Sequence, residues 1–139
     1  MDLELKDKVA IITGSSRGLG LASARALVAE GARVTICARG ASALQAAADS
    51  LIRTAGRPDA VLAVEADVAT TAGCEAVMRA TIDRFARVDI LVNSVGKAGG
   101  GDIVTTLDAE WQGALDQTLF PAIRMSRLAV PEMRRSGAA

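Results

Sequence analysis

The stretch 8-KVAIITGSSRGLG-20 joins a short apolar run to a glycine-rich turn, and an alanine-rich segment follows it. This order predicts a strand, a turn and a helix. Such a turn directs backbone N–H groups and the positive end of the helix toward one point, which suits a cluster of anionic oxygens. The stretch therefore predicts a phosphate-binding turn, and a glycine-rich turn without a ligand is the alternative.

The three glycines of this turn have distinct expected roles. Gly14 would allow a tight turn out of the strand, Gly18 would leave room for a phosphate at the backbone, and Gly20 would let the helix lie close to the sheet. The spacing G-x-x-x-G-x-G differs from the G-x-G-x-x-G of the usual dinucleotide fingerprint. It is not a P-loop either, because Leu19-Gly20-Leu21 supplies no lysine.

Beyond the turn, four short apolar runs alternate with longer segments of helical periodicity. The runs are VAIIT (9–13), VTICA (34–38), AVLAV (60–64) and DILVN (89–93). Because they are almost wholly apolar, they are typical of strands that are buried on both faces of a parallel sheet. Helices are predicted at about 19–30, 41–55, 71–87 and 106–135.

This alternation predicts an α/β fold, a doubly wound parallel sheet with helices on both faces. Right-handed crossovers place its four strands in the order 3-2-1-4. In the last helix Thr106 is the expected N-cap, with Asp108 and Glu110 in the first turn, where the helix dipole favours acids. Pro121 is expected to bend or break this helix, because it removes one backbone hydrogen bond and crowds the carbonyl of Gln117.

Composition excludes several classes of function. The 139 residues carry 16 basic and 16 acidic side chains without a basic cluster, so the electrostatic footprint of a nucleic-acid binder is missing. No apolar run reaches the roughly 18 residues that span a bilayer, and the polar start MDLELKDK is unlike a signal peptide. With no histidine and only Cys37 and Cys74, no metal site is expected. The cysteines are interpreted as small buried thiols in a reducing cytosol, so a cytoplasmic location is expected.

Three motifs in order, each after a predicted strand, resemble the short-chain dehydrogenase/reductase family and its 3-oxoacyl-carrier-protein-reductase-like members. They are TGSSRGLG (13–20), ADV (66–68) and LVNSVG (91–96), and the resemblance extends to the helix from Trp111 to Met133. The resemblance implies a Rossmann-type sheet that binds NAD or NADP across the carboxyl ends of its strands. Residues 1–139 would then form one partial dinucleotide-binding domain.

The resemblance also implies which residues contact the cofactor. The glycine turn would hold the pyrophosphate and the adenosine ribose. Asp67 would accept a hydrogen bond from the adenine amino group, Val68 would flank the ring, and the 93–96 loop would line the cofactor ribose. The implied cofactor-binding residues are Gly14, Ser15, Ser16, Arg17, Gly18, Leu19, Gly20, Arg39, Asp67, Val68, Asn93, Val95 and Gly96.

Charge at the end of the second strand favours NADP(H) over NAD(H). An acid at this position binds both ribose hydroxyls of NAD and repels a 2′-phosphate. Here Ala38 stands where that acid is expected, and Arg39 follows. With Arg17, two guanidinium groups could bracket a dianionic phosphate. The alternative is that Arg39 is an ordinary exposed arginine and Arg17 a helix-end residue.

The chain departs from the family pattern at the catalytic residues. The family uses a tyrosine whose pKa a nearby lysine lowers, helped by a serine and an asparagine, for hydride transfer between nicotinamide and a carbonyl or alcohol carbon. This chain has no tyrosine, and Thr118 stands at the asparagine position, seven residues after Trp111. The expected Asn-Asn-Ala-Gly is Asn93-Ser94-Val95-Gly96. No catalytic residue is therefore assigned, and the 139-residue chain is expected to be inactive alone.

Two hypotheses follow. In the first, the chain is the cofactor-binding half of a truncated NADP-dependent oxidoreductase, which acts on a small carbonyl or alcohol substrate only in its full-length form. In the second, it is a stand-alone nucleotide-binding module or inactive remnant. The stop after the last helix, where a further strand is expected, favours truncation.

A homo-oligomer is also expected. The fourth strand would present an open edge. The last helix carries more apolar surface than one side of a four-stranded sheet covers, and in the family this helix commonly packs against its copy in another subunit. The apolar side chains are Leu115, Leu119, Ile123, Leu128 and Val130.

Overall fold

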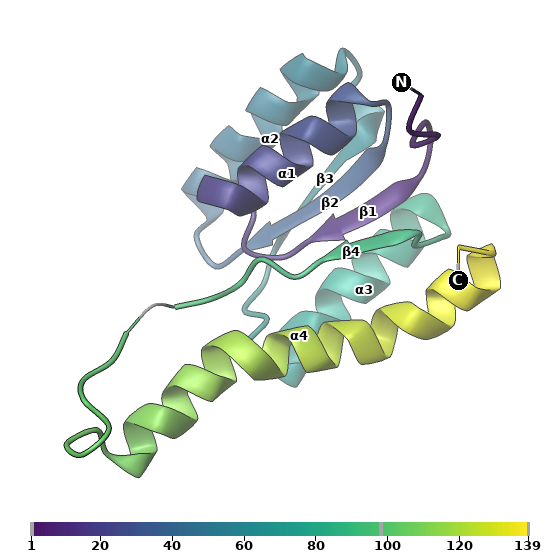
Figure 1. Ribbon diagram of the computed structural model, residues 1–139. Coiled ribbons are helices and arrows are strands. Elements are labelled where there is room, and N and C mark those ends of the chain that lie inside the picture. The colour runs from purple at the N-terminus through teal and green to yellow at the C-terminus, as the bar shows by residue number, and fades with distance from the viewer. Residues whose placement is uncertain (1, 98, 139) are drawn as a thin grey trace.

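The computed structural model describes residues 2–97 and 99–138, so that Ala98, in the glycine-rich stretch GKAGGG (96–101), lies outside the described residues. Strands and helices alternate along the chain, as Figure 1 shows. In chain order they are β1 (Val9–Ile12), α1 (Gly18–Ala29), β2 (Arg33–Ala38), α2 (Ala41–Ala55), the short 3-10 helix η1 (Pro58–Ala60), β3 (Val61–Glu65), α3 (Thr71–Phe85), β4 (Ile90–Val92) and α4 (Asp108–Ser136).

The four strands form one parallel sheet in the order β3-β2-β1-β4, which confirms the predicted α/β class and strand order. Ile11 of β1 is paired with Thr35 of β2 on one side and with Leu91 of β4 on the other. Because all strands run in the same direction, their carboxyl ends meet at one edge of the sheet, where ligands bind in folds of this class.

The helices cover both faces of the sheet. Helices α1 and α2 lie on one face, and α3 and α4 lie on the other (Figure 1). Ile36 and Leu51 belong to the core on the α1/α2 side, whereas Val77 and Met125 belong to the core on the α3/α4 side. All four of these side chains are fully buried. The central strands are therefore buried on both faces, and this burial explains why their sequences are continuously apolar.

The start of α4 differs from the prediction. Leu107, not Thr106, is the N-cap, and the Glu110 carboxylate accepts a hydrogen bond from the Leu107 N–H at 2.9 Å. The Thr106 hydroxyl instead donates to the Asp102 carbonyl at 2.8 Å, within a turn that precedes the helix. The predicted acids of the first turn, Asp108 and Glu110, are confirmed.

Pro121 does not break α4, which continues through it from Asp108 to Ser136. A proline inside a helix costs about 3 kcal/mol. Here Pro121 is the first of three buried residues on the inner face of the helix, and Met125 and Ala129 follow at spacings of four. Burial of this face stabilises the helix against the lost hydrogen bond, because most helical stability in proteins comes from tertiary packing.

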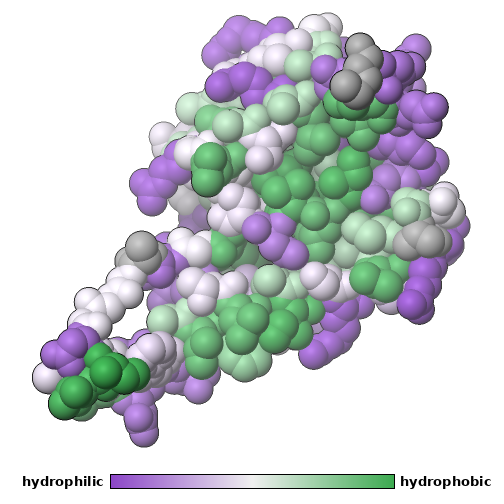
Figure 2. All heavy atoms as spheres, viewed as in Figure 1, coloured by the Kyte–Doolittle hydropathy of each residue, from purple (hydrophilic) through white to green (hydrophobic). Residues whose placement is uncertain are grey.

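Apolar side chains are also exposed on α4. Figure 2 shows hydrophobic atoms gathered along this helix. Trp111, Leu115, Leu119 and Ile123 recur every four residues there and are between 37% and 48% exposed. Within the described part of the chain, no helix is long and apolar enough to cross a membrane.

Candidate functional site

The glycine turn after β1 has the backbone geometry expected of it. Gly14 has a φ of +59°, in the left-handed region that favours glycine. A Cβ on Gly20 would lie 2.5 Å from the Gly14 carbonyl oxygen, so that any side chain there would collide with the backbone of the turn. The close approach predicted for Gly20 is therefore confirmed, and it brings the first turn of α1 against the end of β1.

Helix α1 begins at Gly18, directly after the turn, with Arg17 as its N-cap. No side chain caps this end of the helix. The first N–H groups of a helix have no partner within the helix and carry the positive end of its dipole. They are available to an anion at this position, as the sequence predicted.

Two polar residues fasten the turn to the neighbouring strands. The Ser15 hydroxyl is buried, donates to the Ile12 carbonyl at 2.6 Å and accepts from the Cys37 N–H at 3.0 Å. The Thr13 hydroxyl accepts from the Ser94 N–H at 3.0 Å. The turn after β1 is thereby held against the ends of β2 and β4, and three chain segments converge on one point.

A second segment of the site is the 66–70 loop, defined as the residues between β3 and α3. The Asp67 carboxylate accepts from the Ala69 N–H at 3.0 Å, and the Thr70 hydroxyl, bonded to the Asp67 carbonyl, caps α3 at the Gly73 N–H. A Cβ on Gly73 would lie 1.9 Å from the Asp67 carbonyl oxygen. The loop is therefore held tightly against the start of α3.

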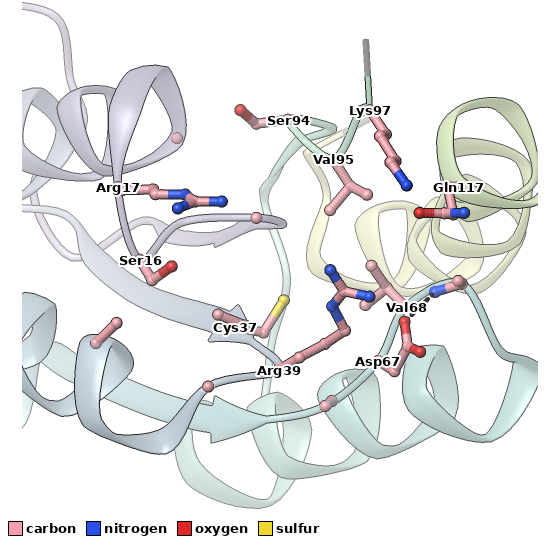
Figure 3. Close-up of a pocket in the computed structure, with 18 of the residues that line it drawn as sticks. Ser16, Arg17, Cys37, Arg39, Asp67, Val68, Ser94, Val95, Lys97 and Gln117 are labelled. Atoms are coloured by element: carbon pink, nitrogen blue, oxygen red, sulfur yellow. Dashed lines mark hydrogen bonds between the residues drawn. The ribbon is translucent and has the colours of Figure 1, made fainter. Parts of the chain in front are cut away.

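These segments enclose a cavity of about 730 Å³ at the carboxyl edge of the sheet, shown in Figure 3. Its volume is in the range of small-molecule and cofactor sites. The structure brings ten of the residues implied by the sequence to its wall. They are Gly14, Ser16, Arg17, Leu19, Gly20, Arg39, Asp67, Val68, Val95 and Gly96.

Four other sequence candidates do not line this cavity. Ser15 is turned into the protein, and Gly18 lies at the start of α1. The Asn93 amide donates to the Ser126 hydroxyl at 3.4 Å, a contact between the end of β4 and α4. The Thr118 hydroxyl donates to the Ala114 carbonyl of its own helix at 2.6 Å.

Positive charge dominates the cavity. Arg17, Arg39 and Lys97 line it, and Figure 3 shows their side chains entering it from three different segments. Asp67 is the one acidic residue among the described residues of the wall, and a smaller adjoining pocket adds Glu65 beside Arg39. Among the ion pairs between described residues, none involves any of the three cations. The cavity therefore suits a ligand with more than one anionic group.

Sequence reasoning missed some residues of the wall. Lys97 follows Gly96 in the loop after β4, and a basic residue in a loop at the carboxyl end of a strand was the signal that could have found it. Gln117 enters from α4 and lies opposite Lys97 in Figure 3. Nothing in its sequence neighbourhood distinguishes it, because only the tertiary placement of α4 brings it to the cavity.

The two cysteines are buried free thiols, as predicted. Burial raises the pKa of Cys37, which lies at the cavity wall, to about 11. Burial also raises the pKa of Cys74, whose thiol donates to the Val68 carbonyl at 3.2 Å. Both thiols are neutral near pH 7 and therefore poor nucleophiles. Within the described residues, no group of three or more His, Cys, Asp or Glu residues could hold a metal ion.

The comparison with known families gives one match over nearly the whole chain. The family described as short chain dehydrogenase matches residues 8–139. A rhamnolipid-biosynthesis 3-oxoacyl-[acyl-carrier-protein] reductase of Pseudomonas aeruginosa is 33% identical over 135 residues, 97% of this chain and 51% of that protein. An NADP-dependent (R)-specific alcohol dehydrogenase of Lentilactobacillus kefiri is 35% identical over 133 residues, 96% of this chain and 51% of that protein.

Solved structures give the same result. The L-sorbose reductase of Gluconobacter frateurii, in complex with NADPH and L-sorbose, superposes with a TM-score of 0.93 at 40% identity. The match covers 99% of this chain and 51% of that one. The chain thus spans about half the length of the relatives that it matches.

Proposed function

The chain belongs to the short-chain dehydrogenase family, and from this premise we propose that its cavity binds NADP(H) in preference to NAD(H). The observation that carries this proposal is the set of three unpaired cations, Arg17, Arg39 and Lys97, around a cavity at the start of α1. The reduced nicotinamide of such a cofactor supplies a hydride to a carbonyl carbon. The chain's own residues bind and orient the cofactor.

The proposed arrangement follows from the geometry of each segment. The pyrophosphate would lie at the glycine turn, where no side chain caps the N–H groups at the start of α1. Arg39, at the end of β2 beside Ala38, and Arg17 receive the 2′-phosphate. One carboxylate oxygen of Asp67 accepts from the Ala69 N–H within the 66–70 loop. The other oxygen would accept a hydrogen bond from the adenine amino group.

In the family reaction, this half would act together with catalytic residues that the 139-residue sequence does not contain. We propose that the longer protein is an oxidoreductase of small carbonyl or alcohol compounds. The 139-residue chain binds the cofactor without turnover, because it has no tyrosine and the Thr118 hydroxyl is engaged within its own helix. The alternative is a nucleotide-binding module without chemistry of its own.

Titration of the chain with NADPH and with NADH, followed by nicotinamide fluorescence, tests the cofactor proposal. We expect NADPH to bind at least about tenfold more tightly, since a hydrogen bond to a charged group is worth about 1.5 kcal/mol or more. Arg39→Asp should remove or reverse the preference, because a carboxylate repels the 2′-phosphate. Arg79→Asp, an exposed position on α3 outside the cavity, is the matched control and should keep the preference.

Equal affinity of the wild-type chain for both cofactors would refute the NADP(H) preference. Both functional hypotheses expect no turnover by the 139-residue chain. The rate of NADPH oxidation with a panel of ketones and aldehydes tests this expectation. Turnover above background by the 139-residue chain, lost in Thr118→Ala, would overturn the proposal that this chain only binds.

A further inference from the structure

Arg124 of α4 makes a hydrogen bond that connects two parts of the site. Its guanidinium Nη1 donates to the Ala69 carbonyl of the 66–70 loop at 2.8 Å, across 55 positions of sequence. Three other carbonyls of the loop accept local hydrogen bonds: the Asp67 carbonyl accepts from Thr70, and the Val68 and Thr70 carbonyls accept from Cys74 of α3. Arg124 thus connects α4 to a loop that is otherwise bonded to α3 and, through the Ala66 N–H, to Ala38 of β2.

Arg124 lies at the boundary between the exposed first half of α4 and the half that packs on the protein core. No residue of the helix before Pro121 is buried, and Figure 1 shows the first half of α4 extending beyond the sheet and α3. Arg124 lies one turn after Pro121, where the helix meets the body of the protein. A contact at this point is placed to restrain residues 108–120, the free half of α4.

The free half of α4 carries a residue of the cofactor cavity. Gln117, Phe120 and Arg124 are spaced by three and four residues, so they lie on one face of the helix. The Phe120 ring lies 5.3 Å from the Arg124 guanidinium carbon, a cation–π contact that orients the guanidinium. Gln117, one turn before Phe120, lines the cavity. One helical face therefore joins the 66–70 loop to the cavity wall.

We propose that Arg124 is a positioning residue, which couples the adenine end of the cavity to α4 and thereby holds Gln117 over the bound cofactor. The 66–70 loop is held by α3 on one side and by Arg124 of α4 on the other. A ligand that binds against this loop therefore also restrains α4, because Arg124 transmits the restraint. The proposal rests on the proposed function, because it requires that the adenosine part of the cofactor lies against this loop.

Hydrogen exchange of the backbone amides, measured by mass spectrometry, tests the coupling. The probes are adenosine 2′,5′-bisphosphate, which carries the adenine end alone, and nicotinamide mononucleotide, which lacks it. The variants are Arg124→Met, which removes the donor, and Arg124→Lys, which retains a cationic donor. Arg127→Met is the matched control, since Arg127 is an exposed arginine three positions further along the same helix.

In the wild-type chain we expect the bisphosphate to slow exchange in both 66–70 and 111–123, by at least about threefold in the helix. In Arg124→Met the protection of 66–70 should remain and the protection of 111–123 should be lost. Arg124→Lys should recover part of it, and Arg127→Met should behave as the wild type. Nicotinamide mononucleotide should not protect 111–123. Full ligand-induced protection of 111–123 in Arg124→Met would overturn the proposal, because Gln117 would then be held without the arginine.

The ligand-free proteins separate this proposal from the proposed function. Without ligand, exchange in 111–119 should already be faster in Arg124→Met than in Arg127→Met. If the bisphosphate fails to bind the wild-type chain, the cofactor proposal is refuted, while this ligand-free difference still decides whether Arg124 restrains the helix. Equal ligand-free exchange in the two variants would refute the restraint itself.

Discussion

At the scale of single residues, the site depends on two glycines that serve different physical needs. Gly14 needs its left-handed backbone conformation, which other residues adopt only with strain. Gly20 instead has an ordinary helical backbone, but a Cβ there would lie 2.5 Å from the Gly14 carbonyl oxygen. The requirement for glycine at position 20 is therefore steric, whereas the requirement at position 14 is conformational.

Gly20→Ala should destabilise the chain by about 1–3 kcal/mol, the usual cost of forcing extra atoms into a packed site. Gly113→Ala is the matched control, because Gly113 also lies in a helix but a Cβ there meets nothing within 4 Å. The control should gain about 0.5–1 kcal/mol from the better helix propensity of alanine. Urea unfolding monitored by circular dichroism measures both changes, and equal effects of the two substitutions would contradict the steric account.

Single residues also show how much of the site the sequence could predict. Gly14, Arg39 and Asp67 each lie within two residues of the end of a strand, and position after a strand is readable from periodicity. Gln117 and Arg124 reach the site only because α4 crosses the face of the sheet beside α3, and no local pattern encodes that placement. Sequence reasoning therefore missed these two residues, which a helix distant in the sequence brings to the site.

At the scale of elements, β4 is fastened to β1 by a buried carboxylate. The Asp89 side chain is 2% exposed, accepts from the Val9 N–H at 2.8 Å, and is paired with Arg87, whose Nε donates at 2.8 Å. Burial raises the pKa of Asp89, but the hydrogen bonds from Arg87 and from the Val9 N–H outweigh it, so the pKa is lowered overall. The ionised carboxylate therefore stabilises the strand that leads to Val95, Gly96 and Lys97.

Asp89→Asn should lower the free energy of unfolding at pH 7 by about 2 kcal/mol, because a hydrogen bond to a charged group is replaced by a neutral one. A carboxyl with a lowered pKa in the folded state contributes stability above its unfolded pKa of about 3.9, and this contribution is lost as the pH falls through the folded value. The difference between wild type and variant should therefore be full at pH 7 and shrink below about pH 4. Urea unfolding between pH 3 and 7 measures it, and a pH-independent difference would contradict this role.

The elements also show where sequence reasoning fails for a physical reason. Helix periodicity located α1, α2 and α3 to within about two residues, the usual uncertainty at helix ends. The predicted N-cap at Thr106 and the predicted break at Pro121 were wrong, because each relied on a local preference. The turn around Asp102 engages the threonine, and burial of the Pro121 face outweighs the helix-breaking preference.

At the scale of the whole molecule, the strand order was predictable from right-handed crossovers together with the doubly wound arrangement, which places helices on both faces of the sheet. Two surface features bear on whether the chain associates with other chains. Among the described residues β4 pairs only with β1, so its other edge is open, and Trp111, Leu115, Leu119 and Ile123 form an exposed apolar stripe on α4. Open strand edges and apolar stripes both favour association with another chain.

We predict that the chain forms a dimer or a larger species at micromolar concentration, which sedimentation velocity measures. Leu119→Glu, in the middle of the stripe, should shift the distribution toward monomer, because it would bury a charge in an apolar contact. Leu3→Glu, an exposed leucine near the amino terminus, is the control and should leave the distribution unchanged. A compact monomer of the wild-type chain would contradict the prediction.

We propose above all that the cavity at the carboxyl edge of the sheet binds a phosphorylated nicotinamide dinucleotide. Titration of the isotopically labelled chain with NADPH, followed by amide chemical shifts, tests it most directly. We expect saturable shifts concentrated in four segments, 14–20, 38–40, 66–69 and 94–97, with smaller shifts at the amino ends of the strands. Saturation without shifts in the glycine turn, or no shifts at all, would contradict it.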